Sequence, residues 1–196
     1  MDTELYLDTA RLGRMCPTAR EAERDFLALV SQLGSSLYFE WFLQHGWNSL
    51  PPRLIRRVPA LRCWDGVAEL KQGIARFLNQ PPDCSTYFFG QSDALIHFAA
   101  DALTRKARSI LTTDLEWPAY LDHLRAMAKR RGRSIHVVPL RRMIFQSGAT
   151  ATDVRELLLD TALANACDGA FVSDITYLGI RLPIEEICSG LRAASA

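Results

Sequence analysis

The sequence predicts an α/β fold, a partial three-layer αβα sandwich built around a mainly parallel sheet. Short apolar runs rich in β-branched and aromatic residues alternate with helical patterns of about 10–15 residues, which is typical of βαβ units. The runs are almost continuously apolar, as strands that are buried on both faces of a parallel sheet require. They lie at residues 85–89, 109–112, 135–138 and 169–173.

The first third of the chain is predicted to be helical. Pro17 lies in the first turn of a helix whose apolar residues recur at helical spacing as far as Leu33. Residues 34–65 predict a helical continuation, a turn and a short connecting segment. A further helix is expected over 67–78, with Asp65 as its cap. We therefore divide the chain into an N-terminal helical segment, residues 1–65, and a sheet-bearing domain, residues 66–196.

A helix follows each of the predicted strands. The expected ranges are about 92–104, 118–131, 153–165 and 183–192, with a linker between 138 and 153. The basic residues Lys129, Arg130 and Arg131 end one of these helices, and Gly132 follows them. Cations complement the dipole at a helix C-terminus, and glycine supplies a left-handed cap. The basic run therefore predicts a helix end rather than a nucleic-acid site.

The overall composition excludes several classes of function. The net charge is +1 over 196 residues, so charge gives no reason to expect a nucleic-acid or membrane partner. The first residues are acidic and lack the pattern of a signal peptide, and no apolar run approaches the roughly 20 residues of a membrane span. Five cysteines without a C-x-x-C pair predict small buried side chains in a reducing compartment. We expect a cytoplasmic protein that binds no metal, nucleic acid or membrane.

Ligands of parallel sheets bind at the carboxyl ends of the strands, so the loops that follow the strands are the candidate sites. Three such loops carry polar residues, at 90–93, 113–117 and 174–179. The first one opens a helix. Backbone N–H groups at a helix start lack intrahelical partners and carry the positive end of the helix dipole, which favours a phosphate.

Four segments, in the same order along the chain, carry a resemblance to one family. The family patterns are Y-L-D-N-A-A-T-G, T-S-G-A-T-E-A, S-D-L-E-H-P and S-H-V-S-N-V-T-G-x-x-x-P-x-x-E-I. The matching segments here are 6–13 (YLDTARLG), 88–94 (FFGQSDA), 113–118 (TDLEWP), and 172–179 (VSDITYLG) with Pro183, Glu186 and Ile187. The chain resembles the N-terminal portion of the class V aminotransferase family. This branch of the pyridoxal-phosphate-dependent (PLP-dependent) enzymes with the aspartate aminotransferase fold includes the cysteine desulfurases.

The resemblance implies a cofactor, pyridoxal 5′-phosphate, and a role for five residues. Gly90, Gln91 and Ser92 would hold the phosphate through backbone N–H groups and the Ser92 hydroxyl. Trp117 would stack on the pyridine ring, and Thr176 would donate a hydrogen bond to the ring hydroxyl. The residues by themselves leave plainer roles open, because Ser92 is also a good helix cap and Trp117 and Thr176 also suit a core. A closer match in letters, Ser147-Gly148-Ala149-Thr150, lies after the third strand and predicts only a turn and a helix cap.

The resemblance also implies residues that 1–196 do not supply. Relatives carry an aspartate that pairs with the pyridine nitrogen and, about two strands later, the Schiff-base lysine. Lys71, Lys106 and Lys129 are the lysines of this sequence, and all lie on predicted helices or helix ends upstream of that position. No catalytic residue is therefore nominated. Residues 66–196 are expected to form an incomplete large domain of the PLP-dependent transferase fold, truncated before the lysine.

Truncation has a consequence for the sheet. In the family's fold the first strand of the large domain pairs with the seventh, so the 85–89 strand would lack its neighbour if the later strands are absent. The fourth strand would then expose an edge, and an unpaired apolar edge invites aggregation or pairing with another chain.

Two functions follow from these expectations. In the first, the chain is the N-terminal part of a PLP-dependent enzyme acting on an amino acid, aminotransferase or cysteine-desulfurase-like, and is inactive as it stands. In the second, it is a non-catalytic remnant or partner-binding module of the same fold. Relatives are usually homodimers, so a homodimer is expected. Residues 1–65 would be a small-domain or interface part. The 35–64 segment, with Tyr38, Trp41 and Trp47, is a candidate for that interface or for substrate contacts.

Overall fold

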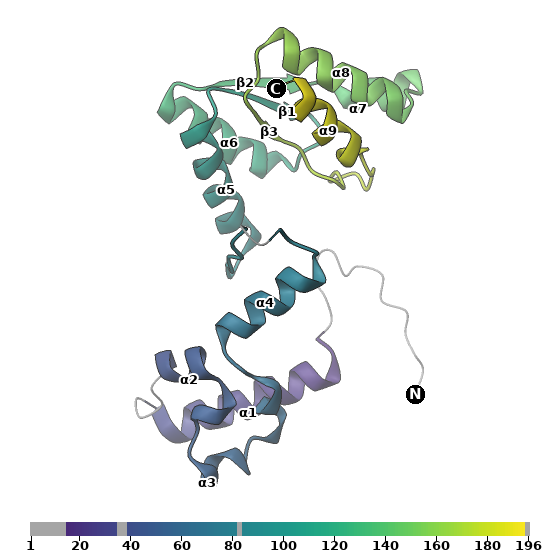
Figure 1. Ribbon diagram of the computed structural model, residues 1–196. Coiled ribbons are helices and arrows are strands. Elements are labelled where there is room, and N and C mark those ends of the chain that lie inside the picture. Colours follow the sequence, from purple (N-terminus) through teal and green to yellow (C-terminus); the bar gives the residue numbers. More distant parts are fainter. Residues whose placement is uncertain (1–14, 35–38, 82–83, 195–196) are drawn as a thin grey trace. The chain divides into compact units, whose positions relative to one another are not determined.

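The computed structural model describes residues 15–34, 39–81 and 84–194, and the chain divides into two compact units, Met1–Tyr87 and Phe88–Ala196 (Figure 1). The YLDTARLG segment at 6–13 lies outside the described residues. The units divide after the helix at 67–77, whereas the sequence pattern placed the domain boundary before it, at residue 65. The helix at 67–77 contacts the helix at 39–45, and this contact places it in unit 1.

Unit 1 is helical, as predicted. Its described elements are α1 (Pro17–Leu33), α2 (Phe39–His45), the 3-10 turn η2 (Trp47–Ser49), α3 (Pro52–Ile55), the 3-10 turn η3 (Pro59–Cys63) and α4 (Val67–Phe77). Their apolar side chains form one core of Leu29, Phe42, Trp47, Leu50, Leu54, Val58 and Leu61. Trp47 is therefore a core residue, 7 % exposed, and not part of an interface surface. Trp41 is exposed, and Tyr38 lies outside the described residues.

The cap of α4 differs from the prediction. Gly66, and not Asp65, is the N-cap, with a φ of 100° that side-chain-bearing residues rarely adopt. A Cβ at this position would come within 2.3 Å of the Gln44 carbonyl oxygen. The close approach of the α4 start to the end of α2 therefore requires glycine. The helix begins one residue later than a cap at Asp65 predicts.

Unit 2 contains the sheet. Its elements are α5 (Ser92–Lys106), β1 (Ser109–Thr113), α6 (Pro118–Arg131), β2 (Ser134–Val138), α7 (Leu140–Ser147), α8 (Ala151–Ala164), β3 (Gly169–Phe171) and α9 (Ile184–Ala194). The strands are parallel in the order β2-β1-β3, with Leu111 paired to His136 on one side and to Ala170 on the other. The predicted α/β fold with a parallel sheet is confirmed.

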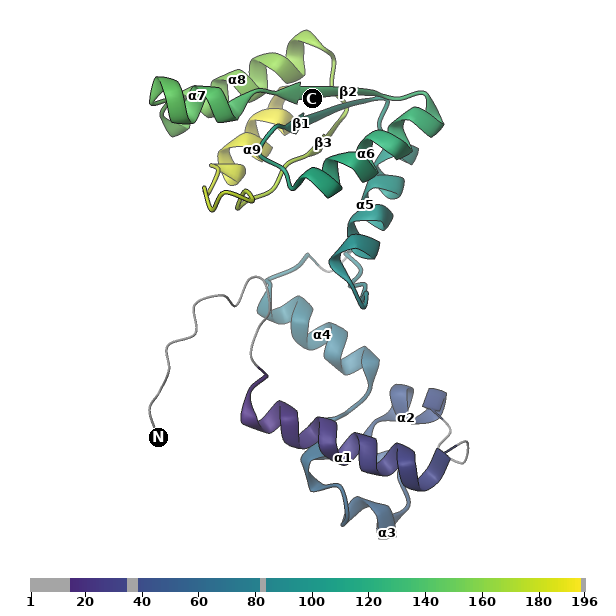
Figure 2. The same cartoon turned by 180° about the vertical axis from the view of Figure 1, so that it is seen from behind.

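Helices cover both faces of this sheet (Figures 1 and 2). On one face, Ile110 packs with Ala100 and Ala107 near α5 and with Leu124 and Met127 of α6. On the other face, Leu111 joins a larger core from β2, α7, α8 and α9, whose members are Leu115, Val138, Leu140, Val154, Leu158, Ala162, Leu182 and Ile187. Successive residues of β1 thus point to opposite faces and into two separate cores, which is the three-layer arrangement that the sequence predicts.

Residues 85–89 do not form the strand that the apolar pattern predicts. The segment is irregular, and Phe88 and Phe89 are exposed. An isolated strand leaves its N–H and C=O groups without a ladder, so an apolar run becomes a strand only where a neighbouring strand pairs with it. The described sheet has three strands and none of them lies beside this segment. This outcome agrees with the expectation that the segment would lack a neighbour.

The predicted linker between residues 138 and 153 contains a helix, α7. Leu140, Met143 and Ile144 have the i, i+3, i+4 spacing of a helical face and pack on the larger core. This spacing was present in the sequence and was overlooked. The 147–150 turn is confirmed, because Gly148 ends α7 with a φ of 63° and Thr150 caps α8 in a capping box with Asp153.

The cysteines are less buried than expected. All five carry free thiols, and Cys16, Cys63 and Cys84 are exposed while Cys167 and Cys188 are half-buried. Cys16 and Cys63 lie at element ends, and Cys84 lies in the segment between α4 and α5.

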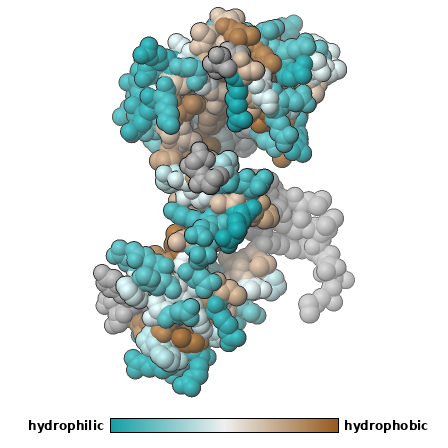
Figure 3. Space-filling view, in the orientation of Figure 1, coloured by the Kyte–Doolittle hydropathy of each residue, from teal (hydrophilic) through white to brown (hydrophobic). Residues whose placement is uncertain are grey.

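Apolar and hydrophilic surface are interleaved on the visible face of the molecule (Figure 3). Among the described residues, no helix combines the length and apolar character that crossing a membrane requires.

Asp168 anchors the start of β1 from the turn that precedes β3. Its Oδ1 accepts hydrogen bonds from the backbone N–H groups of Arg108, at 2.7 Å, and Ser109, at 2.8 Å. The bond from Ser109 holds the pKa of Asp168 below its usual value of 3.8, the bond from Arg108 acts in the same direction, and desolvation opposes both. The charged carboxylate therefore holds the central strand to the β3 edge.

We expect Asp168 to make unit 2 sensitive to acid. The pKa of Asp168 is lower in the folded chain than in the unfolded chain. Its contribution to stability is therefore fully present above the unfolded-state pKa of 3.8 and is lost as the pH falls through the folded-state pKa. Asp168→Asn should remove this part of the pH dependence between pH 5 and 2, measured by hydrogen exchange of the β1 amides. An unchanged acid profile in the variant would contradict the assignment.

Candidate functional site

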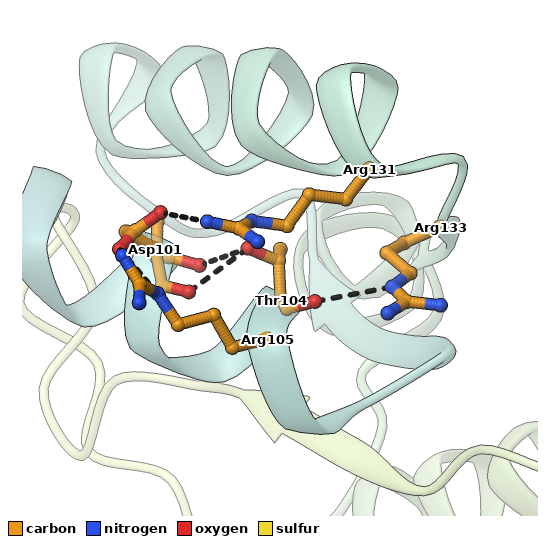
Figure 4. A network of polar contacts seen from close by, with 6 residues as sticks. Asp101, Thr104, Arg105, Arg131 and Arg133 are labelled. Carbon is orange, nitrogen blue, oxygen red and sulfur yellow. Dashed lines mark hydrogen bonds and ion pairs between the residues drawn. The ribbon is translucent and has the colours of Figure 1, made fainter.

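Helices α5 and α6 lie side by side and run in the same direction (Figure 4). Near their beginnings, His123 Nε2 lies 2.6 Å from Asp93 Oδ1. Near their ends, Arg131 contacts Asp101 Oδ1 at 2.6 Å, and an Arg105 bond at 2.8 Å holds the other oxygen of that carboxylate. Because α6 begins just after β1 ends, its start lies at the carboxyl end of the sheet, where the prediction places a ligand. The start of α5 projects away from the sheet and is joined to α6 by the Asp93–His123 pair (Figures 1 and 2).

Asp101 of α5 lies between Arg105 of its own helix and Arg131 of α6 (Figure 4). The hydrogen bond from Arg131 is the main cause that lowers the pKa of Asp101, and the bond and charge of Arg105 add to it. Farther along, Arg133 Nε donates to the Thr104 carbonyl at 3.1 Å. The basic end of α6 is therefore used to fix α5 against it, consistent with a structural role for the basic run.

The start of α5 is exposed and lightly capped. Gly90, Gln91 and Ser92 are all exposed, and Gln91 is the N-cap residue without a side-chain capping bond. Ser92 is the first helical residue, so it does not act as the N-cap. The first backbone bond of the helix runs from Leu95 N–H to the Gln91 carbonyl at 3.3 Å. The N–H groups of the first turn thus face solvent at a helix N-terminus, as an anion seat requires.

A carboxylate and two histidines flank this helix start. Asp93 lies in the first turn of α5 and pairs with His123 of α6. The ring of His97, one turn along α5, meets the His123 ring edge-on with centroids 5.4 Å apart. The contact with His123 holds the Asp93 carboxylate against α6. Sequence analysis missed this pair because the two residues belong to different helices.

Trp117 ends the loop after β1 and is the N-cap residue of α6. Its side chain is 53 % exposed, so it is not a core residue. Tyr177, from the loop after β3, meets the indole ring edge-on, with centroids 5.9 Å apart. The structure thus brings the second and third candidate loops together at the carboxyl end of the sheet. Tyr177 was not among the predicted site residues, although it follows Thr176 directly.

Thr176 is placed differently from Trp117. It is only 3 % exposed, and its Oγ1 accepts a hydrogen bond from the Ile180 N–H at 3.1 Å. Its backbone N–H donates to the Ile180 carbonyl at 2.9 Å, and its carbonyl accepts from Gly179. Thr176 therefore closes the tight loop that carries Tyr177, and its hydroxyl oxygen accepts a bond within that loop, which leaves the O–H group able to donate.

Glu116 is an important polar residue of this region that sequence analysis did not single out. It is 1 % exposed, and its Oε1 accepts from Thr113 Oγ1 and from the Ser173 backbone N–H, each at 3.1 Å. Its Oε2 accepts from the Ser173 hydroxyl. One buried carboxylate therefore ties the end of β1 to the chain just after β3. A charged residue three positions after the end of a buried strand was the available signal.

The neighbouring residue Asp114 has a related task. Its Oδ1 accepts from the Arg141 backbone N–H at 3.0 Å and so caps the start of α7 from outside the helix. In the loop after β1, Glu116 therefore bonds to the chain just after β3, Asp114 bonds to the start of α7, and Trp117 is exposed. Leu115 of the same loop is buried in the larger core. Among the described residues, no group of His, Cys, Asp or Glu is arranged to hold a metal ion.

Comparison with known proteins shows the fold. No family model and no curated protein matches the chain. A similar solved structure is that of a lysine-to-alanine mutant of C-DES with glycine covalently linked to its PLP cofactor. The TM-score is 0.57 at 19 % sequence identity, over 92 % of this chain and 41 % of the C-DES chain. The chain therefore has the fold of a PLP-dependent enzyme of this type and spans less than half the length of that solved chain.

Proposed function

We propose that this chain is the N-terminal part of a PLP-dependent enzyme that acts on an amino acid, of the class V aminotransferase or cysteine-desulfurase-like type. The observation that carries the proposal is the placement of two features. The exposed ring of Trp117 lies at the start of α6, at the carboxyl end of the sheet, in a chain with the fold of C-DES. The exposed start of α5 is joined to the first half of α6 by the Asp93–His123 pair. When bound, the cofactor supplies an electron sink for chemistry at the amino-bearing carbon.

The residues at the start of α5 fit a phosphate group. Gly90 has no side chain, and a Cβ there would meet no atom within 4 Å, so the approach to the backbone is open. Gln91 and Ser92 follow on the exposed helix start, with the Ser92 hydroxyl as an additional donor. The Asp93 carboxylate lies beside this seat, with its Oδ1 2.6 Å from His123 Nε2. In this proposal, Gly90, Gln91 and Ser92 bind the phosphate, and the contact with His123 holds the Asp93 side chain against α6.

Trp117 fits the ring of the cofactor, whereas Thr176 fits it less well. An exposed indole supported from its edge by Tyr177 can stack on a pyridine ring through its face. The Thr176 hydroxyl is buried and already accepts a bond from Ile180. A contact between Thr176 and the ring hydroxyl would require the loop at 174–181 to open, so the proposal rests on the phosphate seat and on Trp117.

No lysine of unit 2 lies near this end of the sheet. Lys106 ends α5 and Lys129 is in the last turn of α6, and both positions are at the helix ends opposite to Ser92 and Pro118. Residues 1–196 would therefore hold the cofactor non-covalently at most. Covalent attachment in the proposed enzyme requires a lysine from outside these residues, together with the rest of the sheet.

The apolar surface of unit 2 supports the view that more structure packs on it. Within the described residues, β3 pairs only with β1, and Phe88, Phe89, Leu95 and Phe98 are exposed around the start of α5. Exposed apolar side chains beside a strand edge are typical of a surface covered by another segment. The same observation supports a second candidate function, a non-catalytic module that binds a partner chain. The first candidate, the PLP-dependent enzyme, would be a homodimer.

An experiment on residues 1–196 separates the two candidates. We expect PLP to quench Trp117 fluorescence reversibly, pyridoxal without the phosphate to bind at least about 10-fold more weakly, and Trp117→Phe to lose the signal. Because three other tryptophans lie in unit 1, the variant is the necessary control. Borohydride treatment should leave no adduct on Lys71, Lys106 or Lys129. Equal affinity for the two compounds would remove the phosphate seat and favour the partner-binding module.

A further inference from the structure

A hollow of 410 Å³ lies on unit 2 between the loop after β1, helix α7 and the loop after β3. The residues that line it are Asp114, Arg141, Arg142, Phe145, Gln146 and Leu178. Its volume is within the range of small-molecule sites, and its lining combines two guanidinium groups with two exposed apolar side chains, Phe145 and Leu178. None of the interactions described above occupies it.

The two arginines are in an unfavourable position for the helix that carries them. Arg141 and Arg142 are in the first turn of α7, where the positive end of the helix dipole disfavours cations, and this turn contains no acidic residue. The carboxylate of Asp114 bonds to the backbone N–H of Arg141 and not to its guanidinium group. The ion pairs among the described residues include neither guanidinium group. Neither the helix dipole nor an ion pair therefore accounts for two cations at this site.

Arg141 contacts Tyr177, a residue of the candidate site. Its guanidinium carbon lies 5.4 Å from the centre of the Tyr177 ring, in a cation–π contact. Tyr177 in turn meets the ring of Trp117 edge-on. A planar ring therefore holds the Arg141 head group in a fixed place next to the carboxyl end of the sheet. A guanidinium group fixed in this way loses little freedom on binding a planar anion.

We propose that this hollow binds a small amphipathic carboxylate. The carboxylate would accept hydrogen bonds from Arg141 and Arg142, whose planar donors match its two oxygens. The apolar body of the ligand would lie against Phe145 and Leu178. Together with the negative Asp114, the lining has a net charge of +1, from two arginines and one aspartate, which suits one carboxylate.

A link to the proposed enzyme follows, and this link rests on the proposed function. Arg141 reaches the ring-stacking candidate Trp117 through one intervening side chain, Tyr177. The carboxylate held at Arg141 and Arg142 would then belong to the amino-acid substrate, and its apolar portion would select among side chains. Binding of the carboxylate by itself does not require the cofactor, so the two proposals are tested separately.

The test uses residues 1–196 without cofactor, with hexanoate and its neutral counterpart hexanamide as probes. We expect hexanoate to shift the backbone amide resonances of Tyr177, Leu178 and Phe145. Hexanamide should bind at least about 10-fold more weakly, because charge-assisted bonds are replaced by neutral ones. Arg141→Gln and Arg142→Gln should each weaken hexanoate binding, and the double variant should abolish it.

Arg125→Gln is the matched control, since Arg125 is an exposed arginine of α6 paired with Asp122. The Arg125→Gln variant should bind hexanoate with the same affinity as the parent chain. Amide exchange in α7 shows whether each variant remains folded. Equal binding of hexanoate and hexanamide, unchanged affinity in a folded double variant, or no binding of hexanoate would each overturn the proposal. None of these outcomes bears on the phosphate seat at α5, which is probed with PLP.

Discussion

Replacing Glu116 by alanine is expected to lower the free energy of unfolding of unit 2 by about 3 kcal/mol, since it removes a charged acceptor from three donors. The Thr113 hydroxyl and both the N–H and the hydroxyl of Ser173 would lose their partner in a buried place. These bonds join the ends of β1 and β3, so the loss should be cooperative. Urea unfolding, combined with hydrogen exchange of the β1 amides, measures it and assigns it to unit 2.

The control for Glu116 is another glutamate in the same unit. Glu156 is exposed on α8 and makes only a long contact with the adjacent Arg155, at 3.6 Å. Glu156→Ala should change the free energy of unfolding by no more than about 0.5 kcal/mol. If Glu116→Ala were as mild as Glu156→Ala, the carboxylate would not be the link between the two strand ends, and the loop after β1 would be held by apolar packing alone.

Leu124→Ala is expected to destabilise unit 2 by about 3–4 kcal/mol, through lost burial and the cavity that remains. Leu124 is the fully buried residue of α6 that packs with Ala100 and Ile110, between the helix pair and the central strand. Leu163→Ala makes the same chemical change at a residue that is 60 % exposed, near the end of α8, and should cost under about 1 kcal/mol. Chemical denaturation of both variants gives the comparison.

Leu124→Ala has a second expected effect, on the candidate site. The α5–α6 contact aligns the two helix starts, and the Asp93–His123 pair spans it. A cavity below this pair should raise the exchange rate of the α5 first-turn amides more than that of the α8 amides. Uniform acceleration in both helices would mean that the helix pair does not position the α5 start.

The parts of the fold that local pattern determines were predictable. Pro118 and Gly132 bound α6 at the residues expected, because proline at the first helical position and a left-handed glycine after the last are local signals. The parallel sheet followed from the apolar, β-branched runs at 109–112 and 135–138, which lie within β1 and β2. The run at 85–89 has the same local character but is not a strand, because pairing depends on a neighbour that no local pattern reports.

The site was predictable only as far as its loops. The rule for parallel sheets pointed to the loop with Trp117 and the loop with Tyr177, and these loops do meet. Which side chains turn inward was not predictable, since Thr176 and Glu116 are buried while Trp117 is exposed. The Asp93–His123 pair depends on the packing of two helices 30 residues apart, and sequence spacing alone carries no signal for it.

The central claim is that the start of α5 is a seat for the phosphate of PLP. Its most direct test is a titration of residues 1–196 with PLP, followed by backbone amide resonances. We predict saturable shifts at Gly90, Gln91 and Ser92 that inorganic phosphate reproduces more weakly, and none at the look-alike turn that ends in Thr150, which its capping box already occupies. Shifts at Thr150 without shifts at Gly90 to Ser92, or no shifts at either, would contradict the claim.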